Sequence, residues 1–248
     1  MSQVATKTEA MRIGGHHLGQ IRPALATFTQ VGSTFEQIEA EAQRLITAAG
    51  AKPSFSTVPG YSWATCIMKN DELCHGIPKH KRVEDGDVIT IDVGLIWAGF
   101  HLDTTTTFVV GKTTLATERF LEVGKRALAK AITKATIGNS VYDVSFAMEK
   151  ITVEHGFSVV NQLTGHGIGK KLHDEPEIPC FSQKSDKKKK FIEGQTVAIE
   201  IMYAAGDAFL VLDKDGWTYR TKDGSLTGMF EETVLITQFG PEILTKSS

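Results

Sequence analysis

Three apolar segments of the sequence each carry an acidic residue in their interior. Asp92, Glu200 and Glu231 stand within Val88–Ile96, Thr196–Met202 and Met229–Ile236. The β-branched composition of these segments is typical of buried strands. A carboxylate in such a strand must be paired, protonated or bound to metal, because an isolated buried charge is costly. The three acids are therefore candidates for metal ligation or acid–base chemistry.

A fourth acid, Asp103, follows Asp92 across a predicted hairpin. Trp97-Ala98-Gly99 predicts a tight turn in which Gly99 supplies positive φ. Folding about this turn brings the two aspartates to opposed or adjacent positions. Like charges that close repel unless a cation lies between them or one is protonated. The alternative interpretation is a half-exposed strand with two solvated acids.

Two histidines lie in or near a glycine-rich stretch. His166 stands between Gly165 and Gly167 just after a predicted strand, and His173 follows it. Glycines there leave room for a group to approach the imidazole, whereas the alternative is an ordinary surface or hydrogen-bonded histidine. One histidine with four carboxylates suits a pair of divalent ions such as Mn, Fe, Co or Zn better than a thiolate zinc site. We therefore expect the cysteines to take no part as ligands.

The elements that must position these residues alternate between helices and hairpins. Helices are predicted in two pieces over 8–50, then over 117–135 and 140–155. Strands are predicted over 62–68, 88–96, 100–110, 158–162, 195–203, 217–221 and 229–237. Two stretches of helix, each followed by antiparallel hairpins, indicate an α+β fold with an approximate internal duplication. We expect one domain over 1–248, because no proline- or serine-rich linker divides the chain.

Composition indicates an ordinary globular protein. The 248 residues are 41% hydrophobic and carry a formal net charge of −2, which gives no general reason to expect a nucleic-acid partner. The three cysteines form no CxxC pair and cannot all be bridged, which favours a reducing compartment. The N-terminal residues lack a secretory pattern, and no apolar run approaches the ~20 residues of a membrane helix. We therefore expect a soluble, cytoplasmic protein.

The acids and histidines, taken in order, resemble the type I methionine aminopeptidases of the pita-bread metallopeptidase family. The resemblance covers nearly the whole chain. Its most specific parts are Cys74-His75-Gly76-Ile77-Pro78, the Asp92-to-Asp103 spacing, Gly165-His166-Gly167-Ile168-Gly169 and the strand glutamates. It implies a pita-bread fold: an antiparallel sheet with helices packed on one side and a pseudo-twofold internal repeat.

Site roles follow from this resemblance residue by residue. It implies metal ligation by Asp92, Asp103, His166, Glu200 and Glu231, with Asp103 and Glu231 bridging two ions. It implies catalytic or substrate-contacting roles for His75 and His173, and a proton shuttle at Glu200 between an activated water and the leaving amine. It places Tyr61, Cys66 and Trp217 at the substrate side-chain pocket, although ordinary core packing is an equally valid interpretation of these three.

The activity implied by the resemblance is hydrolysis of the N-terminal methionine from new polypeptides with a small second residue. The cofactors would be two divalent ions, Co, Mn, Fe or Zn, and the protein a monomer that acts on nascent N-termini without membrane or DNA partners. Two alternatives remain: an Xaa-Pro aminopeptidase or prolidase-like peptidase of the same fold, and a non-catalytic binding relative.

Some positions depart from the family pattern. Glu232 stands where type I members usually have histidine, and Ile201 where proline is common. Val58-Pro59 occupy the place of a tyrosine and a histidine that often contribute to the pocket. Outside the pattern, the basic run Lys187–Lys190 has two interpretations, weak docking on ribosomal RNA or a solvated loop between strands.

Overall fold

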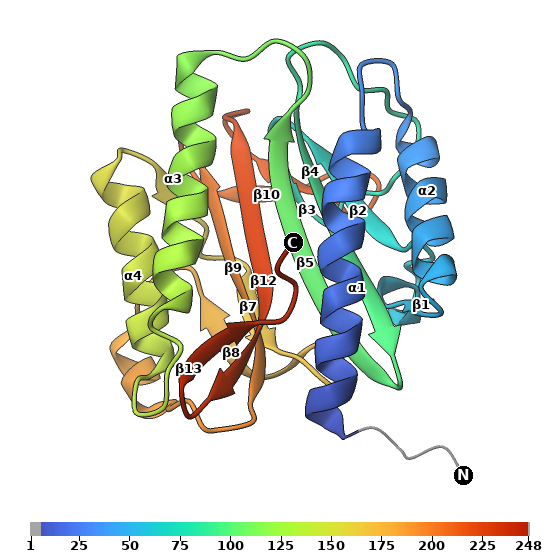
Figure 1. Cartoon of the computed structure of the whole chain (residues 1–248). Helices are drawn as coiled ribbons and strands as arrows, with labels where there is room; N and C mark the ends of the chain where they lie inside the picture. The colour runs from blue at the N-terminus through green and yellow to red at the C-terminus, as the bar shows by residue number, and fades with distance from the viewer. Residues whose placement is uncertain (1–5, 248) are drawn as a thin grey trace.

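A twisted antiparallel sheet forms the centre of the computed structural model, which describes residues 6–247 (Figure 1). Its strands run in the order β1-β4-β5-β12-β9-β7-β8, with β2 on β4, β6 on β9 and β13 on β12, and a small second sheet has the order β10-β11-β3. The strand bounds are Lys52–Pro53 (β1), Thr65–Lys69 (β2), Glu72–Cys74 (β3), Val88–Trp97 (β4), Phe100–Val109 (β5), Ser158–Val159 (β6), Thr164–Gly167 (β7), Asp174–Pro179 (β8), Thr196–Ala204 (β9), Leu210–Leu212 (β10), Tyr219–Thr221 (β11), Thr227–Thr237 (β12) and Gly240–Ile243 (β13).

The four α-helices of the described residues cover one face of this sheet (Figure 1). They are Lys7–Phe28 (α1), Phe35–Ala48 (α2), Leu115–Ile132 (α3) and Val141–Glu154 (α4), with short 3-10 turns at Phe55–Thr57 (η1) and Lys184–Lys188 (η2). Threonine or serine stands at each N-cap, and three of the four caps form reciprocal capping boxes. No helix among residues 6–247 combines the length and apolarity that a membrane crossing requires.

Two halves of similar layout make up the molecule. In the first half, α1 packs on β4 and β5, and α2 on β1 and β2; in the second, α3 packs on β9 and β12, and α4 beside α3. The buried apolar residues accordingly form two core clusters, one largely beneath each helix pair. The predicted α+β fold with an internal duplication is confirmed.

Helix α1 runs straight through two glycines that weaken its sequence signal. A Cβ on Gly14 would lie 2.6 Å from Leu102 Cδ1, and one on Gly15 would lie 2.7 Å from Leu244 Cβ. The helix therefore approaches the sheet and the C-terminal segment more closely than any larger residue permits. Packing, which stabilises most protein helices, outweighs the low helix propensity of these glycines.

The predicted hairpin joins β4 to β5 with its register resolved. Ala98 and Gly99 both have positive φ, 48° and 81°, as a tight two-residue turn requires. Asp92 pairs with Thr105, and Asp103 pairs with Gly94. The two aspartates are thus diagonal neighbours on one face of the sheet. Of the two expected arrangements, opposed or adjacent, the structure has the adjacent one.

Several sequence-based boundaries need correction. His166, expected just after a strand, lies inside β7, where it pairs with Ala198 of β9. Strand β2 begins at Thr65 rather than residue 62, and β6 ends at Val159 rather than residue 162. Strands β7 and β8 were not predicted, because β7 is rich in glycine and β8 has proline at two of its six positions, so both lack the usual strand composition.

Candidate active site

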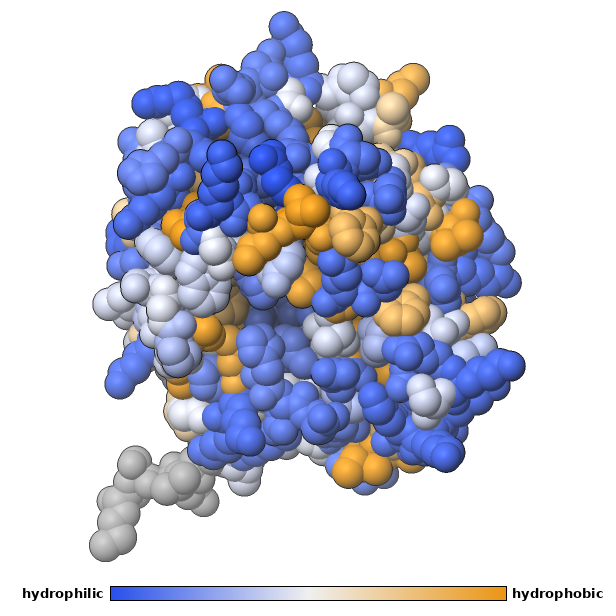
Figure 2. All heavy atoms as spheres, turned by 180° about the vertical axis from the view of Figure 1, so that it is seen from behind, coloured by the Kyte–Doolittle hydropathy of each residue, from blue (hydrophilic) through white to orange (hydrophobic). Residues whose placement is uncertain are grey.

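A cavity of about 300 Å³ opens on the face of the sheet opposite the helices. Figure 2 shows this face, with a hollow near its centre and hydrophobic side chains gathered about it. All ten residues with a site role predicted from the sequence line the cavity: Tyr61, Cys66, His75, Asp92, Asp103, His166, His173, Glu200, Trp217 and Glu231. The fold therefore brings together positions that span most of the chain.

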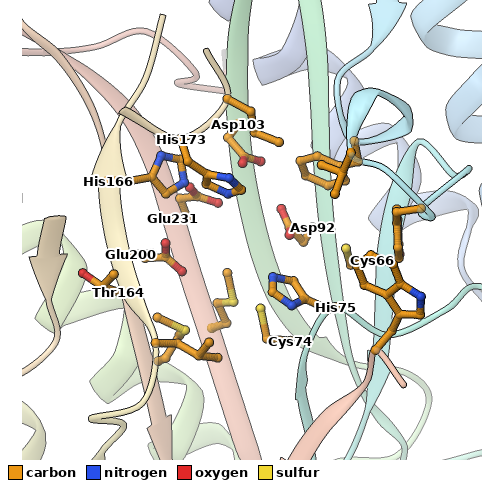
Figure 3. A pocket seen from close by; sticks show the side chains of 18 of the residues that line it. Cys66, Cys74, His75, Asp92, Asp103, Thr164, His166, His173, Glu200 and Glu231 are labelled. Carbon is orange, nitrogen blue, oxygen red and sulfur yellow. The ribbon is translucent and has the colours of Figure 1, made fainter. Parts of the chain in front are cut away.

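Three of the predicted metal ligands form the tightest group. Ligand atoms of Asp103, His166 and Glu231 all lie within 4.8 Å of one another, and each residue is buried. They come from β5, β7 and β12, so both halves of the molecule contribute (Figure 3). Such convergence of two carboxylates and an imidazole is a donor set for a divalent ion.

Asp92 and Glu200 complete the acidic lining on either side of this group (Figure 3). Glu200 in β9 is paired directly with Glu231 in β12 across the ladder. Asp92 in β4 lies beside Thr105, whose Oγ1 is 2.9 Å from Asp92 Oδ1 and 2.8 Å from Glu231 Oε2. Four buried carboxyl groups therefore share one pocket.

Burial and mutual repulsion set the ionisation of these acids. Burial, followed by the charges of neighbouring carboxylates, raises the pKa values of Asp103, Glu200 and Glu231 well above their ordinary range. Burial likewise raises the pKa of Asp92 to about 6, although hydrogen bonds from its neighbours oppose the shift. None of the residues that line the cavity is lysine or arginine. The compensating positive charge must come from bound protons or bound cations.

The donor atoms fit a divalent metal. Asp103 Oδ1 is buried without any hydrogen-bond partner, although a carboxylate oxygen is a strong acceptor. The Thr105 hydroxyl has one proton for two carboxylate neighbours, so the other contact leaves a lone pair uncompensated. A cation among these oxygens would satisfy both deficits. An oxygen-rich set with one nitrogen matches the chemistry of Mn, Fe, Co or Zn.

His166 is oriented for ligation by its own backbone. Its Nδ1 lies 2.9 Å from the Gly167 carbonyl oxygen, which can only accept, so Nδ1 carries the proton and Nε2 has a free lone pair. Burial, with the nearby His173, lowers the pKa of His166 to about 4. The imidazole is thus neutral at neutral pH, the form that binds a metal ion.

Two further histidines face the acidic group. The ring of His173 stands edge-on to His166, with centroids 4.5 Å apart. His75 packs against Tyr219 and has a φ of 56°, which is rare for a residue with a side chain. Such a strained backbone is tolerated where a side chain must be aimed precisely into a site. Burial lowers the pKa of His75, so it also is neutral at neutral pH.

An apolar wall forms the rest of the cavity. The Tyr61 ring meets Trp217 edge-on at 5.1 Å, and its hydroxyl is fixed 2.8 Å from the Thr65 carbonyl oxygen. Burial raises the pKa of the Cys66 thiol, which is therefore neutral. Sequence reasoning did not identify the other apolar lining residues Phe55, Leu163, Leu172, Met202 and Met229. Val58 lines the cavity at the position of departure from the family, whereas Pro59 is not among its lining residues.

Threonines that support the ligands were also missed. Besides Thr105, Thr233 accepts from the Asp103 N–H at 3.1 Å and donates to the Asp103 carbonyl at 2.8 Å. The run Thr104–Thr107 directly after Asp103 is a sequence signal, because alternate residues of a strand share a face with the ligand. The partner Thr233 carries no such signal, since its contact spans 130 positions.

The metal-free protein is expected to lose stability as pH rises above 6.5. The raised carboxyl pKa values mean that the unfolded state binds fewer protons than the folded state, so the free energy of unfolding falls with pH. The lowered pKa of His166 makes the free energy of unfolding rise with pH, but only below pH 6.5, the ordinary pKa of histidine in the unfolded state. We expect the melting temperature of chelator-treated protein to fall between pH 6.5 and about 8, and saturating Mn²⁺ to reduce this fall. A metal-free melting temperature that stays constant or rises across this range contradicts the assignment.

Comparisons with known proteins place the chain among related proteins. The model of metallopeptidase family M24 matches residues 9–238. A methionine aminopeptidase of Clostridium perfringens is 36% identical over 237 residues, covering 96% of this chain and 95% of that protein. The crystal structure of methionine aminopeptidase from Thermotoga maritima has a TM-score of 0.93 at 33% identity, with 100% of both chains covered.

Prolidases share the fold at a greater distance. The prolidase from Pyrococcus furiosus has a TM-score of 0.79 at 23% identity and is covered over 64% of its length, against 98% of this chain. That likeness concerns the fold alone. The match of the family model across most of the chain, together with relatives similar over nearly their whole length, shows that the chain belongs to metallopeptidase family M24.

Proposed function

We propose that this chain is a methionyl aminopeptidase that removes the N-terminal methionine from new polypeptides with a small second residue. The observation that carries the proposal is the convergence of four buried carboxyls and one neutral imidazole beside a pocket walled by Tyr61, Cys66 and Trp217. The acidic group supplies a metal centre, and the wall supplies room for one apolar side chain. Aromatic rings and a thiol suit the polarisable thioether of methionine.

The proposed cofactors are two divalent ions, Co, Mn, Fe or Zn. Asp103 and Glu231 would be shared, with Asp92 completing one set of ligands, and His166 and Glu200 the other. When bound, such ions supply an activated water at neutral pH and a Lewis acid for the scissile carbonyl. The protein contributes neutral His166, whose Nδ1–H is held by Gly167, and carboxyls that release their protons when metal binds.

The remaining steps belong to side chains. Glu200 is the proposed proton carrier, which takes a proton from the attacking water and delivers it to the leaving amine. His173 would donate a hydrogen bond to the scissile carbonyl oxygen, and His75 would contact the peptide nitrogen. Both histidines line the cavity beside the ligand group (Figure 3).

We further propose that the chain acts as one catalytic domain in the cytoplasm and as a monomer. Ligands from both halves meet in one site, which supports the single unit. Three free, buried cysteines fit a reducing compartment.

Weak association with the ribosome is a further part of the proposal. In η2 and after it, Lys187 lies 4.6 Å from the Tyr142 ring centroid, Lys189 pairs with Asp186 at 3.1 Å, and Lys190 donates to the Gly138 carbonyl. Lys187, Lys188 and Lys190 are exposed, where their charges can attract phosphates.

A peptide panel tests the activity. Metal-free protein reconstituted separately with Mn²⁺, Fe²⁺, Co²⁺ or Zn²⁺ is expected to cleave a Met-Ala peptide at least ~100-fold faster than an Ala-Pro peptide with one or more of these ions. Preference for Ala-Pro would indicate the prolidase-like alternative. Absence of both metal binding and turnover would indicate a non-catalytic relative.

Glu200→Gln tests the proton carrier. The amide retains the shape but cannot accept the proton, so kcat on Met-Ala should fall at least ~100-fold at saturating metal, in keeping with the usual size of general acid–base contributions. Glu177→Gln, an exposed exchange of the same type in β8, serves as control and should leave kcat within about twofold. Near-normal turnover by Glu200→Gln at verified metal loading would remove this role from Glu200.

Charge removal tests the ribosome contact. Replacing Lys187, Lys188 and Lys190 by glutamine should lower co-sedimentation with ribosomes at low salt, because each lost phosphate contact weakens binding. The matched control replaces the exposed Lys112, Lys130 and Lys214, which lie outside the run. If the two triple variants sediment like the unaltered protein, the run is a solvated surface.

A further inference from the structure

The two halves of the sheet meet along a short seam between β5 and β12. Each of these strands supplies one of the two carboxylates proposed to bridge the ions, Asp103 from β5 and Glu231 from β12. The register pairs between the strands are Glu231 with Thr105 and Glu232 with Thr104. The separation of the bridging carboxylates therefore depends on a seam with little backbone pairing.

Threonine side chains extend the seam at both ends. Thr107 Oγ1 accepts from the Met229 N–H at 2.9 Å and donates to the Met229 carbonyl at 2.7 Å. At the other end Thr233 bonds both the N–H and the carbonyl of Asp103. Side chains thus replace backbone ladder bonds, which makes the spacing sensitive to whatever holds them.

An arginine from α1 hydrogen-bonds both strands of this seam from the helix-bearing face of the sheet. Arg22 Nη1 lies 2.6 Å from Thr104 Oγ1, 2.7 Å from Glu232 Oε1 and 3.3 Å from the Glu231 carbonyl oxygen. Thr104 Oγ1 in turn donates to the same Glu231 carbonyl at 2.9 Å. One guanidinium therefore holds β5 and β12 together directly behind Glu231.

Glu232 carries the connection to the other bridging ligand. Its Oε2 accepts from Thr245 Oγ1, which itself accepts from the Thr233 N–H at 3.0 Å. Thr233 is the residue that bonds the backbone of Asp103. A continuous set of hydrogen bonds thus runs from Arg22 through Glu232 and Thr245 to Asp103. Figure 1 shows the segment after β13 crossing the helix-bearing face of the sheet. Within this segment, Thr245 reaches the seam through its bonds to Glu232 and Thr233.

The pair is nearly removed from solvent. Side-chain exposures are 12% for Arg22 and 13% for Glu232. A buried ion pair contributes little net stability, because desolvation offsets most of the attraction. By contrast, its several charge-assisted bonds fix geometry. The arrangement is suited to positioning rather than to stabilising the fold.

We propose that Arg22 and Glu232 are positioning residues that set the spacing of Asp103 and Glu231, and through it the affinity for a pair of divalent ions. This inference rests on the metal-binding part of the proposed function. Neither residue lines the ligand cavity. Their effect reaches the ions only through the backbones of the two bridging ligands.

Arg22→Met should weaken Mn²⁺ binding at least ~10-fold by calorimetry, the usual scale for outer-shell support of a metal site. At two equivalents of Mn²⁺, the spin-coupled electron paramagnetic resonance signal of paired ions should be reduced in favour of isolated ions. Arg12→Met is the matched control: Arg12 also lies on α1 and pairs with Glu242 at 2.7 Å, but this pair is exposed. It should leave Mn²⁺ affinity within about threefold.

A double variant guards against loss of folding. Arg22→Met alone leaves the buried Glu232 without its partner, which can destabilise the protein. Arg22→Met with Glu232→Leu removes both charges, and it should fold yet retain the weakened Mn²⁺ binding. Unaltered affinity and coupling in the folded double variant overturn the positioning role. If the unaltered protein itself binds no pair of ions, the proposed function fails instead, so the two failures are distinguishable.

Discussion

The structure depends on one electrostatic constraint: four carboxyl groups are buried together without a lysine or arginine among the residues that line their cavity. In metal-free protein the repulsion is relieved by protons, as the raised pKa values of Asp103, Glu200 and Glu231 indicate. Divalent ions would neutralise these charges more fully, with the carboxylates as their ligands. The paired strands and supporting threonines hold this unfavourable group in place.

Much of the fold and site could be predicted because the most informative residues are acids within otherwise apolar strands. An acid inside an apolar strand, as at Asp92 and Glu200, is costly unless it has a function. The hairpin turn then placed Asp103 beside Asp92, with only the register left open. Glu231 was a candidate by the same pattern, but its role and that of His166 depended on resemblance, since a histidine between glycines has several ordinary explanations.

The unpredicted parts rest on contacts between distant positions. In the sequence Arg22 is only one of several polar residues of a predicted helix, and its hydrogen bond to Glu232 spans 210 positions. Nothing in the sequence marks Thr245 or Thr233. Their contacts form only when the C-terminal segment packs on α1. Strand β7 escaped prediction because its glycines, which let Gly167 approach Glu175 closely, give it little strand character. Local patterns thus pointed to candidate ligands such as Asp92, Asp103 and Glu200, but not to the residues that support them.

The position of the seam has a consequence for how the protein assembles. The seam is built from distant parts of the chain. Strands β5 and β12 supply the proposed bridging ligands, α1 supplies the guanidinium, and the final segment supplies Thr245. Contacts of such long sequence separation form slowly, because loop closure must precede them. Each half alone would hold only part of the proposed ligand set: two acids in the first half, and two acids with His166 in the second. The group of Asp103, His166 and Glu231 forms only when the two halves have docked, so metal binding at this group would report the completion of folding.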